Sequence, residues 1–503
     1  MISNTVSLRE ICEEDAALLF NWRNDPEIVS LGTSSRKVEW EEHKNWVRNS
    51  FHNPDRCIYI ILINGIPGGQ IRFDRENEYS AVISIYLLSD FRFKGISAYV
   101  FYEGISLVLK RWHELNKIIA FIRSENNKSI KAFTNAGFNE ERIEKTPENH
   151  VSMVFQVKKG KVPHNRLTFG EEEIDAVKSV VESGYWASGK GVVALEKHAA
   201  ETSENNHAIA VSSGFSALRI SLLALGVKKG DEVIIPGYCC VALANAVLAV
   251  GAVPVTADID FKTLNLSADS VSKCITKNTK AIIAVHAFGL PAPIMLLKDL
   301  GMKVIEDCAH CFGINTEAGR IGSLGDIAIN SFYATKLVGG GEGGMILTNS
   351  DEYATFASDF RDYTDKPPHA QRMNDKMSNL EAALSLEQLK RLPAMIRSRK
   401  TIAERYHEKL SNNPSAQFEL PIFDQDRVWY RYGIKIKGGA ERMISIMEKD
   451  GIGTDKPVFD WTGENHTIPF AKRAYSEVLS LPCYPTLQPQ EQDRVIESFL
   501  QNI

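Results

Sequence analysis

The sequence predicts an α/β protein of two domains, and three features of the chain indicate this class. Its 503 residues exceed the usual size of a single domain. A lysine-rich stretch followed by Pro163 changes the composition near residue 158, so we expect a first domain over 1–158, a linker over 159–166 and a second domain over 167–503. Beyond residue 230, short apolar runs alternate with helix-like stretches, which is typical of a mainly parallel sheet covered on both faces.

Four runs of the second domain predict the strands of this sheet. They are 231–237, 253–260, 279–289 and 303–310. Ligand-binding side chains in such sheets follow the carboxyl ends of the strands. Asp258, His286 and Asp307 are expected at these ends.

The first domain mixes strand-like and helix-like segments. The β-rich runs 57–63 and 81–88 are bounded by turn residues and predict strands. The spacing of apolar residues over 98–115 and 127–138 predicts helices.

Composition and charge exclude several classes of protein. The formal net charge of −5 argues against nucleic-acid binding, which requires a basic face. No apolar run approaches the roughly 20 residues that span a bilayer, and the first residues do not resemble a signal peptide. The eight cysteines show no periodic spacing, so a reducing cytoplasm is expected.

A lysine and an upstream aspartate are the strongest catalytic candidates. Asp307 follows an apolar strand, where a carboxylate is costly unless it caps a helix or meets a cation. Lys336 precedes five glycines that lead into a strand-like run, so neither the dinucleotide-binding motif nor the P-loop motif fits. A desolvated lysine that forms a Schiff base, together with a carboxylate on a cationic ring nitrogen, is the pair that pyridoxal phosphate (PLP) requires.

A phosphate anchor for PLP is predicted where a short strand meets a helix. The connecting residues are Ser212, Ser213, Gly214, Phe215 and Ser216. Free amides at a helix start, with hydroxyls beside them, bind phosphate. The alternative is a simple capping turn.

Cys308 and Cys311 form a C-x-x-C with His310 between them. A metal site would need a second pair at matching spacing, which the sequence lacks. A redox motif would open a helix beside an exposed thiol. We expect both thiols to pack as small hydrophobic groups, with a redox role as the alternative.

These motifs and their order resemble the DegT/DnrJ/EryC1/StrS sugar aminotransferases. The resemblance covers about 167–503 and rests on stretches such as "SSGFSAL", "IEDCAHCFG", "GSLGDIAINSFYATK", "GEGGMILT" and "RMNDKMSNLEAAL". It implies a PLP enzyme of fold type I, with a mainly parallel sheet and a smaller C-terminal α/β subdomain. It also implies a homodimer.

The resemblance implies a role for each matching residue. Lys336 would form the Schiff base and move protons, and Asp307 would pair with the pyridine nitrogen. His310 would lie near the cofactor's hydroxyl group. Ser331 and the turn formed by 213–216 would bind the phosphate.

Three further positions complete or depart from the family pattern. Asn374 would reach the phosphate of the neighbouring subunit. Cys240 stands where the family has an aromatic residue on the cofactor ring, so either its sulfur or the ring of Tyr238 would pack there. Phe215 replaces the usual threonine of the phosphate turn.

A second resemblance covers about residues 5–157. Arg92, Gly95 and Ser97 stand between a strand-like and a helix-like run, where small residues free backbone amides for a pyrophosphate. Asn126 and Ser129 follow downstream. The combination resembles motifs A and B of the GNAT acetyltransferases, with Ser97 in place of the last glycine.

The GNAT resemblance implies that acetyl-CoA binds on the loop 92–97, with backbone hydrogen bonds from near Ile85 and Leu87 to its pantetheine arm. Phe133 stands where many members have a tyrosine that protonates the leaving thiolate. His43 is a candidate general base, because the pKa of histidine lies near working pH. The alternative is a solvated helix residue.

The two halves predict consecutive reactions, since an aminotransferase makes a primary amine and an N-acetyltransferase consumes one. The stretches "NWRNDPEIV" and "EEHKNW" look like the GNAT branch that acts on nucleotide-linked amino sugars. We expect a bifunctional enzyme that aminates a nucleotide-linked keto-deoxysugar, with glutamate as donor, and acetylates the product for a surface polysaccharide such as O-antigen. The alternatives are that only the aminotransferase half is active, or that the chain is a ligand-sensing regulatory protein.

Overall fold

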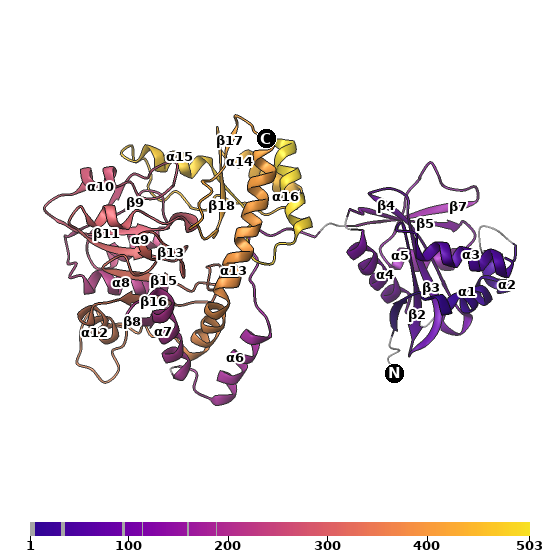
Figure 1. Cartoon of the computed structure of the whole chain (residues 1–503), viewed down its shortest axis with the longest axis horizontal. Coiled ribbons are helices and arrows are strands. Elements are labelled where there is room, and N and C mark those ends of the chain that lie inside the picture. Colours follow the sequence, from indigo (N-terminus) through magenta and orange to yellow (C-terminus); the bar gives the residue numbers. More distant parts are fainter. Residues whose placement is uncertain (1–5, 32–35, 93–95, 113, 158–159, 188) are drawn as a thin grey trace. The chain divides into compact units, whose positions relative to one another are not determined.

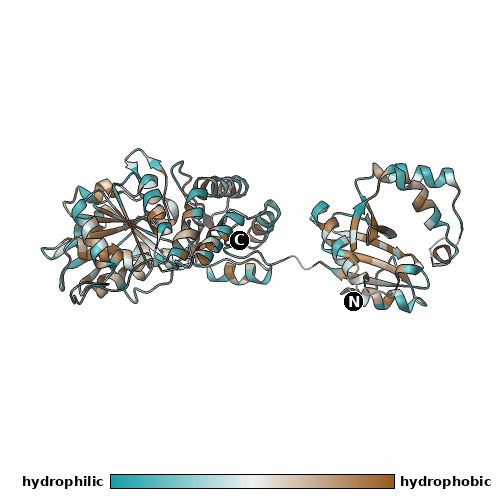
Figure 2. Ribbon diagram, turned by 90° about the horizontal axis from the view of Figure 1, so that it is seen from below, coloured by the Kyte–Doolittle hydropathy of each residue, from teal (hydrophilic) through white to brown (hydrophobic). Residues whose placement is uncertain are grey.

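The chain consists of two compact units, Met1–Gly160 and Lys161–Ile503. The computed structural model describes all residues except 1–5, 32–35, 93–95, 113, 158–159 and 188 (Figure 1). In each unit hydrophobic strands lie inside and helices surround them (Figure 2).

The amino-terminal unit is built on a seven-stranded sheet of order β1-β2-β3-β4-β5-β7-β6. β4 and β5 run parallel, whereas the other neighbouring pairs of described strands are antiparallel. The strands are β1 (Val6–Glu10), β2 (Arg56–Ile63), β3 (Ile66–Arg75), β4 (Ser80–Leu87), β5 (Lys117–Arg123), β6 (Asn139–Glu140) and β7 (His150–Gln156).

Helices cover both faces of this sheet, which explains why β2 is almost continuously apolar. Along β2, Cys57, Tyr59 and Ile61 face one core, while Ile58 and Ile60 face another. α4 and α5 contribute to the first core, and α1, α2 and α3 contribute to the second. The helices are α1 (Ala16–Arg23), α2 (Pro26–Leu31), α3 (Trp40–Phe51), α4 (Ser97–Arg111) and α5 (Asn127–Asn135).

The second unit contains a seven-stranded sheet of order β10-β9-β11-β12-β15-β16-β8. The pairs from β10 to β15 are parallel, and β16 is antiparallel to both of its neighbours. The strands are β8 (His207–Val211), β9 (Glu232–Pro236), β10 (Val253–Ala257), β11 (Thr279–Val285), β12 (Lys303–Asp307), β15 (Ile327–Ser331) and β16 (Gly344–Thr348). A short hairpin pairs β13 (Asn315–Thr316) with β14 (Gly319–Arg320).

A smaller α/β part follows the long helix α13 (Asn379–Ser411) and contains a three-stranded sheet of order β17-β18-β19 (Figure 1). Its elements are β17 (Phe418–Glu419), β18 (Tyr432–Ile436), α14 (Glu441–Lys449), α15 (Pro469–Glu477), β19 (Val478–Leu481) and α16 (Pro489–Asn502). The other helices of the unit are α6 (Glu171–Ser183), α7 (Lys190–Ser203), α8 (Gly214–Ala224), α9 (Ala242–Ala249), α10 (Ala268–Cys274), α11 (Ile294–Lys298) and α12 (Asp351–Phe360).

The four runs predicted as parallel strands are β9, β10, β11 and β12, and these strands are neighbours in the sheet. The prediction is thus confirmed. Asp258 and His286 follow the ends of β10 and β11, and Asp307 is the last residue of β12, so all three lie at carboxyl ends as expected.

Much of the segment predicted as a linker packs onto the second unit. Val162 is fully buried and pairs with Ile452 in a β-bridge. His164 Nε2 lies 2.8 Å from the Ser480 hydroxyl. The composition predicts a linker over 159–166, whereas the second unit begins at Lys161, because the following side chains find partners there.

No helix in the described part of the chain is both long and apolar enough to cross a bilayer. All eight cysteines are described, and each is a free thiol.

Gly289 lies where the loop after β11 touches the segment before β18. Its φ is 87°, and a Cβ there would overlap the carbonyl oxygen of Val428. We expect Gly289→Ala to lower the free energy of unfolding by more than the roughly 1–2 kcal/mol that a left-handed backbone alone costs. Gly301→Ala is the matched control, since φ is 78° and no atom lies within 4 Å of the added Cβ. Denaturation of the full chain measures both variants, and equal losses would contradict the predicted clash.

The burial of His164 leads us to expect that the stability of the fold depends on pH. Burial, and then the charge of Arg431, lower its pKa to about 3, whereas the unfolded chain takes up this proton near pH 6.5, roughly the ordinary value. Stability therefore falls as the pH drops below this value. His164→Asn removes this titration, so the denaturation midpoint of the variant should change less between pH 7 and pH 5 than that of the wild type. An equal pH dependence in the two proteins would refute this.

Candidate functional site

A buried carboxylate marks the end of β12. Asp307 Oδ1 accepts a hydrogen bond from the Ala309 amide at 3.0 Å, and no described group donates one to Oδ2. Burial raises the pKa of this carboxyl, and the hydrogen bond and the charge of Lys336 counteract this only in part. A further cation beside Asp307 would stabilise its ionised form.

A lysine and a neutral histidine lie next to this carboxylate. Lys336 Nζ lies 3.1 Å from His310 Nε2. Burial, followed by the charges of Lys336 and Arg431, lowers the pKa of His310 well below its ordinary value, so the ring is neutral near pH 7. Its Nδ1 is buried without a hydrogen-bond partner among the described residues. This leaves a polar atom that a ligand can satisfy.

Tyr430 is a site residue that the sequence motifs did not reveal. Its ring stacks on His310, with 4.3 Å between centroids and 16° between planes, and Lys336 Nζ lies 5.4 Å from the ring centroid. Burial would raise the pKa of its hydroxyl, but Lys336, Arg431 and hydrogen bonding from Thr335 together lower it. In the sequence, Tyr430 is marked by the aromatic run "WYRY", which leads into β18.

The predicted phosphate turn lies at the start of α8. Ser213 caps the helix, since its hydroxyl accepts a hydrogen bond from the Ser216 amide at 3.1 Å. A Cβ on Gly214 would lie 2.8 Å from the Cβ of Ser331, so glycine permits close contact with the end of β15. The first amides of α8 have no intrahelical acceptor, and the turn can therefore bind an anion.

The hydroxyl of Ser216 is already engaged by a residue that the sequence analysis did not select. Ser216 Oγ donates to Asp375 Oδ1 at 2.6 Å, and Arg219 pairs with the other oxygen of this buried carboxylate. The hydroxyl of Ser216 thus links the predicted phosphate turn to the segment that carries Asn374. Asn374 itself is exposed.

The two candidates for ring packing differ in exposure. Cys240 is exposed. Tyr238 is buried, and its ring makes edge contacts with Tyr475 at 4.9 Å and Phe288 at 6.0 Å between centroids. The Tyr238 ring is thus held within the core of the unit. Phe215, at the phosphate turn, is 38% exposed.

Cys308 and Cys311 are buried core residues, as predicted. Cys308 shares a small cluster with His286 and Glu306, whose potential ligand atoms lie within 4.8 Å of one another. The Glu306 carboxylate already accepts hydrogen bonds from His286 Nε2 at 3.0 Å and from three backbone amides of the loop 322–325. The cluster therefore fixes the loop before β15.

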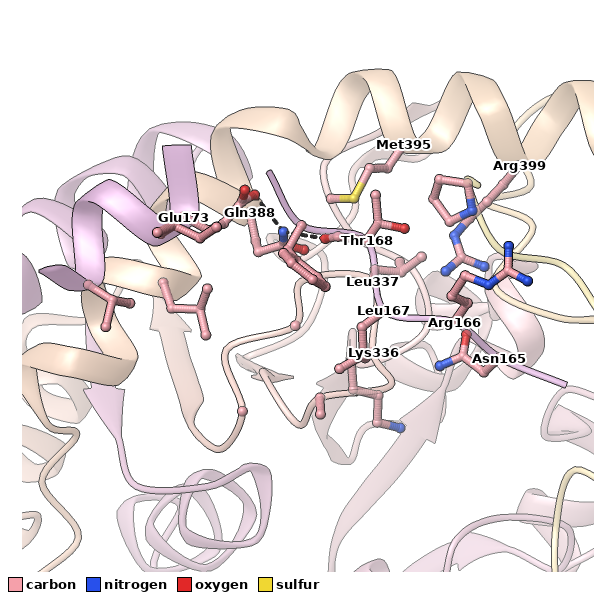
Figure 3. A pocket seen from close by; sticks show the side chains of 18 of the residues that line it. Asn165, Arg166, Leu167, Thr168, Glu173, Lys336, Leu337, Gln388, Met395 and Arg399 are labelled. Atoms are coloured by element: carbon pink, nitrogen blue, oxygen red, sulfur yellow. Dashed lines mark hydrogen bonds between the residues drawn. The ribbon is translucent and has the colours of Figure 1, made fainter. Parts of the chain in front are cut away.

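A pocket of about 510 Å³ opens beside Lys336 (Figure 3). Asn165, Arg166 and Arg399 gather at one end, and Gln388 donates a hydrogen bond of 2.6 Å to Glu173 at the other. The rest of the wall is largely apolar; it includes Leu167, Phe169, Ile174, Val177, Leu337 and Met395.

In the amino-terminal unit, the parallel strands β4 and β5 separate. β4 pairs with β3 along its length, but with β5 only over 80–82. The edge of 83–87 that faces β5, which includes the predicted Ile85 and Leu87, therefore has no strand partner among the described residues. The carbonyl of Leu87 accepts a hydrogen bond of 2.7 Å from Arg92 Nε. Such an open edge can pair with an extended ligand.

The predicted pyrophosphate loop is described only in part. Gly95 lies outside the described residues, and Ser97 begins α4. Asn126 caps α5, because its side chain accepts a hydrogen bond from the Ser129 amide at 3.1 Å. These two predicted contacts to acetyl-CoA thus also form a local helix cap.

His43 is neither solvated nor placed as an exposed base. It is buried, its Nε2 lies 3.0 Å from the carbonyl oxygen of Ala16, and its ring packs among Phe20, Trp40 and Trp46. Burial lowers its pKa. This position favours a structural role over that of a general base.

Phe133 is also a core residue, 4.5 Å from Phe101 and 4.9 Å from Phe138 between ring centroids.

Comparison with known proteins assigns both units. Residues 168–500 match the model of the DegT/DnrJ/EryC1/StrS aminotransferase family, and residues 5–139 match that of the acetyltransferase (GNAT) domain. DesV from S. venezuelae is 29% identical, with a TM-score of 0.63, over 68% of this chain and 98% of that chain. The aminotransferase TlmJ from Streptoalloteichus hindustanus is 28% identical, with a TM-score of 0.64, over the same shares. An aminotransferase from Psychrobacter cryohalolentis is 26% identical, with a TM-score of 0.60, over 67% and 98%.

The family match spans more than half of the chain, and the fold of the second unit agrees with it. The chain therefore belongs to the DegT/DnrJ/EryC1/StrS aminotransferase family and joins a PLP-dependent aminotransferase to a GNAT acetyltransferase domain, whose cosubstrate is acetyl-CoA.

Proposed function

We propose that the chain catalyses two consecutive reactions on a nucleotide-linked sugar. The second unit transfers an amino group from glutamate to a keto-deoxysugar, and the amino-terminal unit acetylates the new amine. The product would serve a surface polysaccharide such as O-antigen, made in the cytoplasm. The observation that carries the proposal is the contact of the Lys336 amine with a neutral histidine, beside a buried carboxylate that lacks a full set of partners.

The residues present fit PLP. The Asp307 carboxylate is destabilised by burial, so a cationic ring nitrogen would compensate it. His310 Nδ1 is a buried polar atom without a partner. The turn at Gly214, packed against Ser331, presents helix amides for a phosphate group.

When bound, PLP supplies an electron-withdrawing ring. Asp307 holds the proton on the ring nitrogen by its negative charge. His310, being neutral, accepts a hydrogen bond from Lys336 without competing for its charge. In its unprotonated form, Lys336 Nζ would take the proton from the Cα of glutamate, and as an ammonium it would later return a proton to the sugar carbon that receives the amino group.

The open edge of β4 supports acetyl transfer. The edge of 83–87 that faces β5, which has no strand partner among the described residues, can hydrogen-bond the extended arm of acetyl-CoA and hold the thioester for attack by the unprotonated sugar amine. A second candidate is that only the aminotransferase half is active. His43 and Phe133 favour this alternative, because His43 is buried against a backbone carbonyl and Phe133 carries no group that can transfer a proton.

We also propose that two copies pair through the aminotransferase unit. Six apolar side chains of the segment 167–186 are exposed, and the first three of them line the pocket: Leu167 52%, Phe169 67%, Ile174 49%, Val181 48%, Tyr185 74% and Trp186 54%. Exposed apolar side chains that gather in one segment support an interaction site. Asn374 is exposed as well, so it is available to a partner subunit.

Lys336→Ala tests the first assignment. We expect it to reduce amination by at least about 10²- to 10⁴-fold, the contribution of proton transfer, while acetylation of a supplied amino sugar is unchanged. Mass spectrometry of UDP-, dTDP- and GDP-linked keto-6-deoxysugars, with PLP and glutamate and with or without acetyl-CoA, follows both steps and identifies the nucleotide. Amination that persists in Lys336→Ala would exclude this lysine. Failure of the wild type to acetylate any amine would support the single-activity alternative.

Ile174→Glu tests the pairing. A charge in the apolar surface should shift the protein from about twice the mass of one chain to the mass of a single chain in light scattering, because an unpaired carboxylate cannot be buried without cost. Ile66→Glu, which changes an isoleucine of 59% exposure in the amino-terminal unit, is the control and should leave the mass unchanged. A wild type of single-chain mass would contradict the proposed dimer.

A further inference from the structure

Arg431 is a half-buried arginine next to the catalytic candidates that neither the sequence motifs nor the proposed mechanism uses. It follows Tyr430 directly and precedes β18. Its Nη1 lies 3.0 Å from Nε2 and 3.2 Å from Nδ1 of His164, and its guanidinium carbon lies 5.0 Å from the centroid of the Tyr430 ring.

The charge of Arg431 is not compensated. No carboxylate of the described residues forms an ion pair with it, whereas Arg166 pairs with Glu491 at 2.6 Å and Arg405 with Asp493 at 2.6 Å. His164 offers only a neutral ring, because burial and Arg431 itself lower the pKa of His164 to about 3. A partly buried guanidinium without a counter-ion is costly and attracts an anion.

Tyr430 connects this cation to the reacting amine. Its ring lies 5.0 Å from the Arg431 guanidinium carbon and 5.4 Å from Lys336 Nζ, and both positive charges act on its hydroxyl. The charges of Lys336 and Arg431 thus act on the same hydroxyl group, and an anion bound beside Tyr430 would be attracted by both. The phosphate turn is built separately, from α8 and the end of β15.

We infer that Arg431, together with Tyr430, binds the α-carboxylate of the amino-acid donor. In an α-amino acid the carboxylate is attached to the same carbon as the amine, so a cation near Lys336 holds the donor with its amine at the reacting position. A guanidinium binds a carboxylate through two parallel hydrogen bonds. The inference rests on the proposed transamination and adds a residue that positions the donor.

The variant Arg431→Met tests the inference in protein loaded with PLP, whose absorbance reports reaction with a donor. We expect the half-saturating concentration of L-glutamate to rise by about 10- to 100-fold, the loss of a charged hydrogen bond. The half-saturating concentration of n-propylamine, which has no carboxylate, should change less than about twofold. Arg405→Met, which removes an arginine that has its own carboxylate partner, is the matched control.

Two substitutions of His164 separate charge from packing. His164→Glu places a carboxylate against Arg431. It should raise the half-saturating concentration of L-glutamate as Arg431→Met does, whereas His164→Asn should not. Without PLP or donor, His164→Glu should also unfold at a higher temperature than His164→Asn, because Arg431 gains its counter-ion.

Several results would overturn the inference. If Arg431→Met weakened the reaction with n-propylamine as much as the reaction with glutamate, Arg431 would be a structural residue. A raised KM for the nucleotide sugar alone would assign Arg431 to a phosphate of that substrate. Equal effects of His164→Glu and His164→Asn would show that packing matters and charge does not. A wild type that reacts with n-propylamine but not with glutamate would contradict the proposed donor, whereas one that reacts with neither would contradict the proposed function; the inference would fail with either.

Discussion

The aminotransferase unit depends on one electrostatic constraint, a carboxylate buried at the end of a parallel strand. Asp307 is fixed there by the pairing of β12 with β11 and β15, and burial raises its pKa. The strand cannot move the carboxylate into water without breaking the sheet, so the energetic cost must be met by positive charge at the same edge. Lys336 supplies part of this positive charge. A cationic cofactor ring would supply the rest, which explains why such a ring suits this position.

Neutral histidines keep the positive charges of this edge available. His310 contacts Lys336 and His164 contacts Arg431, and burial lowers the pKa of both rings. A carboxylate in either place would form a permanent ion pair and remove the cation from substrate binding. A neutral acceptor instead orients the donor group and leaves its charge for an anionic ligand. In this site the neutral histidines orient Lys336 and Arg431, and compensation of the two positive charges is left to the ligands.

The sequence predicted the elements whose pattern is local. β9 to β12 were visible as short apolar runs, and their carboxyl ends placed Asp258, His286 and Asp307 at one edge of the sheet. The sequence pattern does not predict Tyr430, Arg431 and Asp375 as site residues, because their contacts join distant segments. Arg431 contacts His164, 267 residues away, and Asp375 contacts Ser216, 159 residues away. No spacing rule relates such positions. The composition of 159–166 predicts a linker for the same reason, since residues such as Val162 and His164 find their partners only in the folded unit.

His43 shows why residue type alone does not define an acetyl-transfer site. Two glutamates precede it in the sequence, yet the helix α3 turns its ring inward, where aromatic side chains surround it and Nε2 faces a backbone carbonyl. Phe133 also lies in the core and carries no ionisable group. What remains is the geometry of the separated strands: β4 keeps β3 on one side and leaves 83–87 open on the other. Acetyl transfer in this unit would therefore depend mainly on positioning, because a thioester held beside an unprotonated amine needs alignment more than a strong base.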